Sequence, residues 1–164
     1  MLWESIWKLR SIKIKILDNE YSKKSPRTVA IIEARMGSSR LPGKVLAKIN
    51  NTPAISILIS RLKNCCEIDD VVVATSNSPL DDELAEYLKK TNTLFFRGSE
   101  NDVLQRVVDT AGYFDAETIV EINGDCILTD FNVVDSAVQI FNKGNYDVVT
   151  NCGENLSYPM GIYA

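Results

Sequence analysis

The apolar positions of this chain alternate between continuous runs and helical spacing from residue 28 onward. Continuous apolar runs predict buried strands at residues 28–34, 70–75, 93–97, 118–122 and 146–150. Apolar residues three and four apart predict helices at residues 53–63, 80–90, 102–113 and 132–141. Strands that alternate with helices are typical of a doubly wound, mainly parallel sheet. We therefore expect one Rossmann-like α/β domain over residues 28–164.

Residues 1–27 differ in composition from the rest of the chain. They contain seven Lys or Arg and three Asp or Glu, a net charge of +4. Trp3, Ile6 and Trp7 have the spacing of one apolar helical stripe, whereas residues 19–26 are polar. We interpret residues 1–27 as a basic N-terminal extension, because loosely packed segments concentrate at chain ends. The alternative is a membrane-surface or partner-binding arm, which would make the protein a scaffold.

The net charge of −4 hides a local excess of positive charge. With +4 in residues 1–27, residues 28–164 carry −8. A basic patch on an acidic protein indicates a small polyanion such as a triphosphate. The acidic remainder argues against nucleic acid as a partner, since that requires many phosphate contacts. The patch lies in residues 34–66, which contain no acid and six bases, namely Arg35, Arg40, Lys44, Lys48, Arg61 and Lys63.

The chain contains no histidine. This excludes Ser-His-Asp and Cys-His catalysis and favours phosphoryl or nucleotidyl transfer, which depends on positioning and charge neutralisation. The four cysteines form no CxxC motif, so we expect reduced thiols. No apolar run is long enough to span a membrane, and an N-terminus with an acid at Glu4 is a poor secretory signal. We therefore expect a cytoplasmic protein without a membrane span.

A loop rich in glycine, serine and bases follows the first predicted strand, with the sequence ARMGSSRLPGK at residues 34–44. It matches neither the GxxxxGK[ST] phosphate loop nor the GxGxxG fingerprint. Glycines permit close backbone approach, and amides leaving a strand can cradle phosphate. Because ligands bind beyond the carboxyl ends of parallel strands, we expect a triphosphate here rather than a solvated polar loop. The candidate residues are Ala34, Arg35, Met36, Gly37, Ser38, Arg40 and Lys44.

Two further segments carry candidate site residues. Asn123-Gly124-Asp125 follows the fourth predicted strand, where Asp125 is placed either to hold Mg²⁺ on phosphate oxygens or to cap a turn. In residues 97–106, Asp102 and Arg106 lie four apart on a predicted helix. That spacing favours an ion pair between them over a contact with substrate. Helix caps are expected at Asp130 for the last predicted helix, at Ser78 for the helix at residues 80–90, and within residues 99–102 for the helix that follows them.

These segments, in this order, resemble the cytidylyltransferases of the spore-coat polysaccharide type. That family is related to the CMP-sialate and CMP-ketodeoxyoctulosonate synthetases. ARMGSSRLPGK is similar to the family's opening motif, FRGSENDVLQRV to its middle motif and NGDC to its GDxP element. YPMG near the end resembles a further stretch, so the similarity covers residues 28–162.

The resemblance implies a fold of the nucleotide-diphospho-sugar transferase type. It also implies transfer of CMP from CTP to a sugar or sugar acid, with release of pyrophosphate, in the synthesis of surface polysaccharides or glycoconjugates. Carried over by motif, residues 34–37 would lie near the base and phosphates, and Asn123 near the base. Arg35 and Lys44 would neutralise the triphosphate, and Asp125 would bind Mg²⁺. Lys44 and Asp125 would thus be the catalytic residues, with Asp102 and Arg106 as candidates for the substrate site.

The sequence departs from the family pattern at several positions. Ile127 replaces the expected proline, and Met160 and Tyr163 stand where the family has an arginine and a second metal-binding aspartate. The family also has a C-terminal half that helps to bind the acceptor and to form a homodimer, so we expect the domain to be incomplete at its C-terminus. A non-catalytic nucleotide-binding fragment or degenerate partner subunit is therefore the alternative to an active enzyme.

Overall fold

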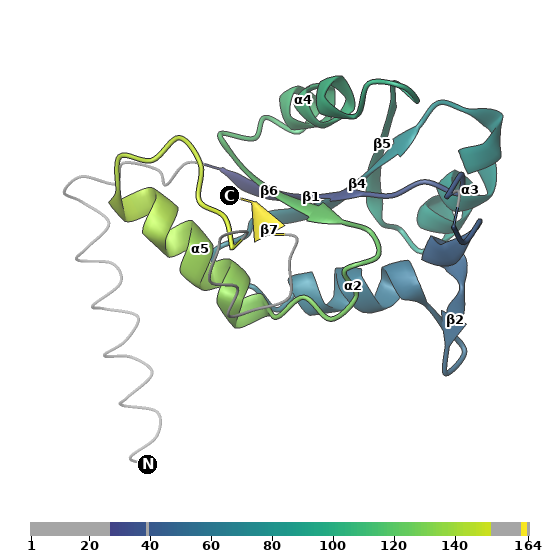
Figure 1. Cartoon of the computed structure of the whole chain (residues 1–164), viewed down its shortest axis with the longest axis horizontal. Helices are drawn as coiled ribbons and strands as arrows, with labels where there is room; N and C mark the ends of the chain where they lie inside the picture. Colours follow the sequence, from purple (N-terminus) through teal and green to yellow (C-terminus); the bar gives the residue numbers. More distant parts are fainter. Residues whose placement is uncertain (1–26, 39, 152–161, 164) are drawn as a thin grey trace, which may run out of the picture.

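The computed structural model of the protein describes residues 27–38, 40–151 and the backbone of 162–163 (Figure 1). The predicted extension, apart from Arg27, lies outside the described residues, as do Ser39, Cys152 and Met160 of the YPMG stretch. Within the described part of the chain, no helix combines the length and apolar character that a membrane crossing requires.

A five-stranded sheet in the order β5-β4-β1-β6-β7 forms the centre of the fold. β1 pairs in parallel with β4 on one side and β6 on the other, and β4 pairs in parallel with β5. β7 adds an antiparallel edge strand to β6. The prediction of a mainly parallel, doubly wound sheet is therefore confirmed. The strands are β1 (Thr28–Glu33), β4 (Asp70–Ser76), β5 (Leu94–Gly98), β6 (Thr118–Asn123) and β7 (Ile162–Tyr163).

Helices cover both faces of the sheet, and the alternation of side chains along each strand decides which helix they meet. Ala30 and Ile32 of β1 pack in the core that contains residues of α2, α3 and α5. Val29 and Ile31 of the same strand pack against Val107 and Ala111 of α4. α4 lies above the sheet in Figure 1, with α2 and α5 below it. The helices are α2 (Ala54–Leu62), α3 (Asp82–Lys90), α4 (Val103–Tyr113) and α5 (Phe131–Lys143).

Short elements that the apolar pattern did not predict lie between β1 and α2 and before α3. A 3₁₀ turn at Lys44–Leu46 leads into a hairpin of β2 (Lys48–Ile49) and β3 (Thr52–Pro53). Asn50 and Asn51 join its strands with φ of 48° and 65°, a left-handed conformation that asparagine tolerates better than most residues. A second 3₁₀ turn at Pro79–Asp81 precedes α3.

The predicted helix caps are confirmed at two of three positions. Asp102 caps α4 by accepting a hydrogen bond from the Gln105 amide at 2.9 Å. Asp130 caps α5 by accepting one from the Asn132 amide at 2.8 Å. Ser78 was expected to cap the helix after Pro79, but its side chain makes no capping hydrogen bond. The prediction was wrong there because Pro79 opens a 3₁₀ turn before α3 begins.

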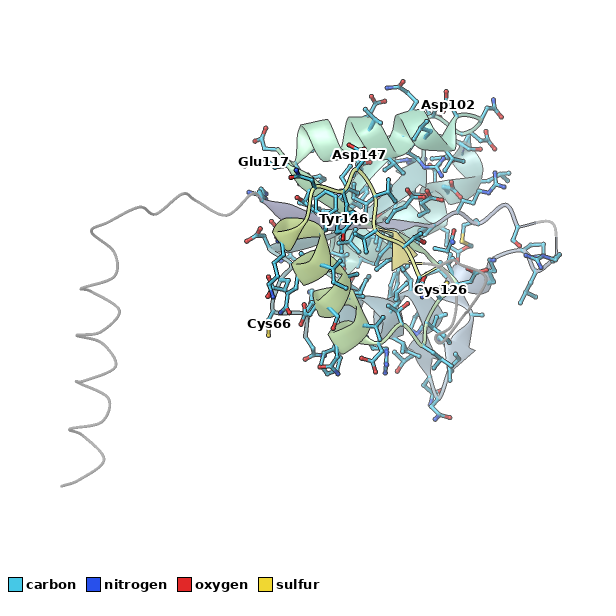
Figure 2. The ribbon with its side chains drawn as sticks, turned by 60° about the vertical axis from the view of Figure 1, so that its left-hand side comes forward. Cys66, Asp102, Glu117, Cys126, Tyr146 and Asp147 are labelled. Carbon is cyan, nitrogen blue, oxygen red and sulfur yellow. The ribbon has the colours of Figure 1, made fainter. Side chains whose placement is uncertain are left out.

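The strand predicted at residues 146–150 is absent, apart from a single-residue bridge at Thr150. Tyr146, which is labelled in Figure 2, and Val148 follow the end of α5 and are 56% and 62% exposed. The β-branched residues there favour a strand, but strand propensity depends on a neighbour to pair and pack with. The position beside β6 is occupied instead by Ile162–Tyr163.

Gly124 permits the close approach of β6 to β1 at the carboxyl ends of the strands. Its amide donates to the Glu33 carbonyl at 2.8 Å, and a Cβ placed on it would lie 2.7 Å from that oxygen. Gly124→Ala should therefore lower the free energy of unfolding by about 1–3 kcal/mol, measured by urea denaturation. Gly112→Ala is the matched control, because a Cβ there meets no atom within 4 Å. That substitution should raise stability by about 0.5–1 kcal/mol, and equal effects of the two would contradict the prediction.

Candidate functional site

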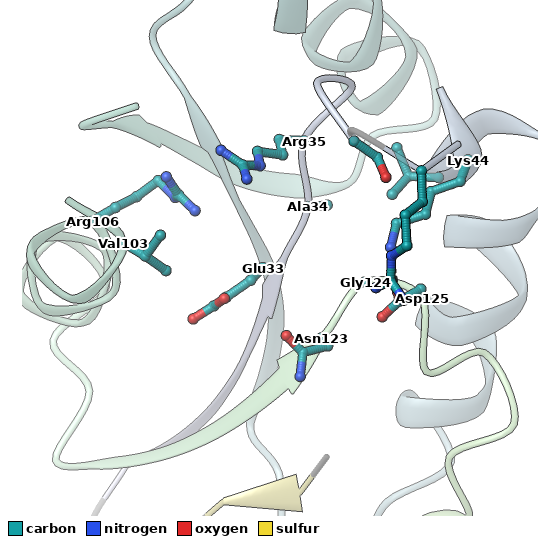
Figure 3. Close-up of a pocket in the computed structure, with 12 residues that line it drawn as sticks. Glu33, Ala34, Arg35, Lys44, Val103, Arg106, Asn123, Gly124 and Asp125 are labelled. Carbon is teal, nitrogen blue, oxygen red and sulfur yellow. Dashed lines mark hydrogen bonds and ion pairs between the residues drawn. The ribbon is translucent and has the colours of Figure 1, made fainter. Parts of the chain in front are cut away.

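A cavity of about 440 Å³ opens at the carboxyl ends of β1 and β6 (Figure 3). β1 is the point where the strand order reverses, with β4 on one side and β6 on the other. Ligands of open α/β sheets bind at such a switch point. The lining residues are Glu33, Ala34, Arg35, Ser38, Arg40, Lys44, Val45, Val103, Arg106, Asn123, Gly124 and Asp125.

The loop after β1 supplies most of the positive charge of this cavity. Arg35, Ser38, Arg40 and Lys44 line it as the sequence suggested, together with Ala34. Met36 and Gly37, which were also candidates, are not among the lining residues. The loop turns around the Met36 carbonyl, which accepts hydrogen bonds from the Ser38 amide at 2.8 Å and the Gly43 amide at 2.9 Å.

Lys44 and Asp125, the two residues proposed as catalytic, form an ion pair with each other. The Lys44 ammonium donates to Asp125 Oδ2, and this hydrogen bond is the main cause that lowers the pKa of Asp125. Asp125 therefore stays ionised, with its Oδ2 held by Lys44. Arg61 of α2 holds the far end of the loop after β6, because its Nε donates to the Thr129 carbonyl at 2.7 Å.

The opposite wall of the cavity comes from α4, where Arg106 and Val103 face β1 (Figure 3). Arg106 is only 2% exposed. Its Nη1 donates to the Ser99 carbonyl at 2.6 Å, and its Nε has no hydrogen-bond partner among the described residues. Burial lowers the pKa of this guanidinium, and the nearby Glu33 carboxyl opposes that shift.

The predicted ion pair between Asp102 and Arg106 was wrong. Within the described part of the chain, the only side-chain hydrogen bond that Asp102 accepts comes from the Gln105 amide. Arg106 instead turns inward beneath Gly98. A Cβ added to Gly98 would lie 2.9 Å from the Arg106 Cγ. Arg106 thus lines the cavity, and Asp102 serves as the helix cap outside it.

The sequence analysis missed two glutamates, of which Glu33 lines the cavity and Glu121 lies beside it. Glu33 ends β1, and Glu121 of β6 lies opposite Ile31 on the same face of the sheet. Burial, together with a hydrogen bond and repulsion from Glu121, raises the pKa of Glu33 to about 7, against the opposing effect of Arg106. The signal for this pair was an acid within the last three residues of each of two largely apolar strands.

The described residues contain no group of three His, Cys, Asp or Glu side chains that could hold a metal ion. Mg²⁺ in nucleotide sites commonly uses one or two carboxylates and takes its other ligands from phosphates and water. Asp125, ionised at the mouth of the cavity, fits that mode. The donor set therefore suits a metal brought with a nucleotide rather than a metal held by the protein alone.

The profile of the cytidylyltransferase family matches residues 29–159, which contain every residue that lines the cavity. This chain belongs to the cytidylyltransferase family. The assignment agrees with the fold, with the basic loop after β1 and with the acidic loop after β6.

Two named relatives are about one-third identical to this chain over the residues that align. The chain is 36% identical over 135 residues to the spore coat polysaccharide biosynthesis protein SpsF of Bacillus subtilis, and this match covers 76% of the chain and 56% of SpsF. It is 32% identical over 120 residues to a 3-deoxy-manno-octulosonate cytidylyltransferase of Chlorobium chlorochromatii, and that match covers 71% of the chain and 46% of the Chlorobium protein. The chain thus spans about half the length of the curated relatives it matches.

A solved structure confirms the fold of this family member. The cytidylyltransferase of Leptospira borgpetersenii superposes with a TM-score of 0.77 at 35% sequence identity. The match covers 84% of this chain and 59% of that one.

Glu121→Gln should lower the pKa of Glu33, because it removes a like charge beside it. The value should stay above 4.5, since burial remains. Carboxyl ¹³C NMR measures the pKa of Glu33, with the exposed Glu100→Gln as the control that leaves Glu33 unchanged.

In the wild type the folded state binds the proton of the Glu33 carboxyl more tightly than the unfolded state does. Stability should therefore fall as pH rises from 4.5 toward 7, and Glu33→Gln should flatten that slope. A slope that Glu33→Gln leaves unchanged would contradict the assignment.

Proposed function

We propose that this cavity binds CTP with Mg²⁺, and that the enzyme transfers CMP to a sugar or sugar acid in the cytoplasm. The carrying observation is the convergence of four cationic side chains, Arg35, Arg40, Lys44 and Arg106, on one cavity at the switch point of the sheet. The family supports CTP as the nucleotide. The names of SpsF and of the 3-deoxy-manno-octulosonate enzyme support an acceptor for polysaccharide or glycoconjugate synthesis. The homodimer expected from the resemblance stays a prediction.

The ion pair between Lys44 and Asp125 defines how these residues would act on a nucleotide. A triphosphate offers Lys44 several anionic oxygens, and a lysine that turns to them releases the Asp125 carboxylate. Asp125 would then hold Mg²⁺, which supplies charge neutralisation on the phosphates. Arg35 and Arg40 would neutralise the remaining oxygens from the loop, and Asn123 lies where the loop after β6 could contact the base.

The transfer itself requires little covalent chemistry from the protein. An acceptor hydroxyl oxygen forms a bond to the α-phosphorus, and the bond from that phosphorus to pyrophosphate breaks. Positioned cations stabilise the charge that develops on the leaving pyrophosphate, and the hydroxyl proton passes to a base or to water. Lys44 is placed to stabilise this charge, because its ammonium already faces the cavity.

The alternative function is nucleotide binding without transfer, as a fragment or as a partner subunit. It is favoured by a residue near the end of the sequence, Tyr163. A second metal-binding aspartate would fall at Tyr163 in the family pattern. The backbone of Tyr163 lies opposite Glu121 in the sheet. We therefore expect this 164-residue chain to bind the nucleotide and to release pyrophosphate slowly or not at all.

Calorimetry with CTP and ATP in the presence of Mg²⁺ tests the proposal. CTP should bind more tightly than ATP, and Asp125→Asn should reduce the part of the affinity that depends on Mg²⁺. Equal or tighter binding of ATP would refute the cytidylyl assignment. Rapid release of pyrophosphate with a sugar acid, lost in Asp125→Asn, would instead reject the alternative and establish this chain as a complete catalyst.

Lys44→Ala should weaken triphosphate binding by about 1.5–3 kcal/mol, the usual contribution of a hydrogen bond to a charged group. Thermal unfolding of the free protein should change little, because the side chains of Lys44 and Asp125 are 27% and 46% exposed and such surface pairs contribute weakly. Lys48→Ala is the control, since Lys48 is exposed in the same basic segment and does not line the cavity. A large loss of stability with unchanged affinity would make Lys44 a structural residue.

A further inference from the structure

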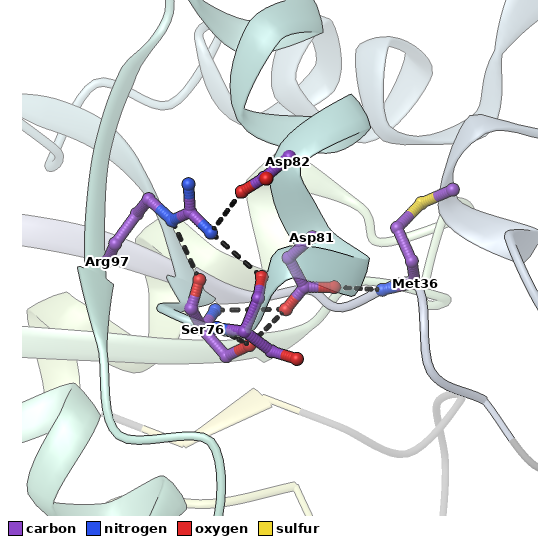
Figure 4. Close-up of polar contacts among 6 residues, drawn as sticks. Met36, Ser76, Asp81, Asp82 and Arg97 are labelled. Atoms are coloured by element: carbon purple, nitrogen blue, oxygen red, sulfur yellow. Dashed lines mark hydrogen bonds and ion pairs between the residues drawn. The ribbon is translucent and has the colours of Figure 1, made fainter.

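Asp81 is a buried carboxylate that joins the loop after β1 to the end of β4. It is 2% exposed, and it lies at the end of the 3₁₀ turn that precedes α3. Its Oδ1 accepts a hydrogen bond from the Met36 amide at 2.6 Å, across 45 positions of sequence. Its Oδ2 accepts bonds from the Ser76 amide at 3.2 Å and from the Ser76 hydroxyl (Figure 4).

Hydrogen bonds fix the backbone of Met36 on both sides of its Cα atom. The amide of Met36 is held by Asp81, while its carbonyl accepts bonds from the amides of Ser38 and Gly43. Gly43 has φ of 71°, a left-handed conformation that glycine adopts at little cost. Ser38 and Gly43 are thus both tied to the carbonyl of Met36, and the amide of the same residue is tied to Asp81. The position of the loop relative to the sheet depends on this carboxylate.

A second set of contacts holds the backbone at Ser76 and Ser78, which lies beside Asp81. Arg97 of β5 donates from Nε to the Ser76 carbonyl and from Nη2 to the Ser78 carbonyl, each at 2.9 Å. Arg97 also pairs with the neighbouring carboxylate Asp82 at 2.8 Å, on the outer side of the turn (Figure 4). Asp81 and Asp82 are therefore adjacent in sequence and opposite in role. The first faces the loop, and the second faces the arginine.

The hydrogen-bond donors around Asp81 explain why a carboxylate suits this position. A buried ionised group is tolerated where hydrogen-bond donors surround it, and Asp81 receives three. None of the salt bridges within the described ranges involves Asp81. Bonds from amides to a carboxylate are shorter and stronger than neutral ones, so the Met36 amide is held firmly. That amide is thereby committed to the protein and is not free for a phosphate.

We propose that Asp81 is the positioning residue of the anion-binding loop. By holding Met36, it places the flanking Arg35 and Ser38 so that both line the cavity. The inference rests on the proposed function only in taking a triphosphate as the anion. Met36 then contributes to the site through the shape of the loop, and the phosphates are contacted by its neighbours.

Asp81→Asn, compared with Asp82→Asn, tests this role in two measurements. The first is the ¹H–¹⁵N spectrum of the unliganded protein. Asp81→Asn should move the amide proton of Met36 upfield and shift the amides of residues 37–44, while core amides such as Ile31 and Val72 keep their positions. Asp82→Asn should leave the Met36 amide in place. A purely structural role would spread the shifts over the core and lower the melting temperature instead.

The second measurement is the affinity for CTP and for inorganic tripolyphosphate. Asp81→Asn should weaken both about tenfold, the scale of one lost charge-assisted contact, and Asp82→Asn should leave both within about twofold. If the wild type binds neither anion, the proposed function fails, and the loop amides still decide whether Asp81 positions the loop.

Two outcomes would overturn the role of Asp81: an unmoved Met36 amide, or a displaced loop with wild-type affinity for both anions. Should Asp81→Asn not fold, hydrogen exchange of the wild type takes its place. Positioning by Asp81 requires the Met36 amide to exchange far more slowly than that of Gly37, and equal rates would reject it.

Discussion

Parallel hydrogen bonding on both sides of β1 governs the geometry of the cavity. The register aligns Glu33 with Ala74 of β4 and with Asn123 of β6, so β1 and β6 end at the same level and β4 runs two residues beyond them. Just after β6, the amide of Gly124 donates a hydrogen bond to the Glu33 carbonyl at the end of β1. The basic loop and the acidic loop are therefore brought together by strand register, before any contact between their side chains.

Much of this arrangement could be predicted from sequence because it follows from local rules. The apolar run of residues 28–34 is β1, and the loop after it lies at the carboxyl edge where ligands of parallel sheets bind. Asn123 and Asp125 reach the same cavity because β6 also runs parallel to β1. Asp102 and Asp130 cap helices, as their positions before apolar segments suggested.

The remainder depended on contacts between distant residues. Spacing on a helix favoured Arg106 as the partner of Asp102, but space beneath Gly98 lets the side chain turn inward. Glu33 and Glu121 are 88 positions apart, and only the register of β1 and β6 brings them onto one face. The run at residues 146–150 has strand propensity without a place in the sheet, since residues 162–163 lie beside β6. Local pattern carries no information about which segment occupies an edge.

Lys44 and Asp125 form an ion pair, so each side chain competes with any ligand that the other could bind. An anion that takes Lys44 leaves the Asp125 carboxylate open, and a cation that takes Asp125 leaves Lys44 open. The first ligand to arrive therefore bears the cost of separating the pair, and the second does not. Such coupling is reciprocal, since each ligand must raise the affinity for the other by the same factor. Under the proposed function, nucleotide and metal would therefore favour each other's binding, most strongly at low ionic strength, where the attraction within the pair is least screened.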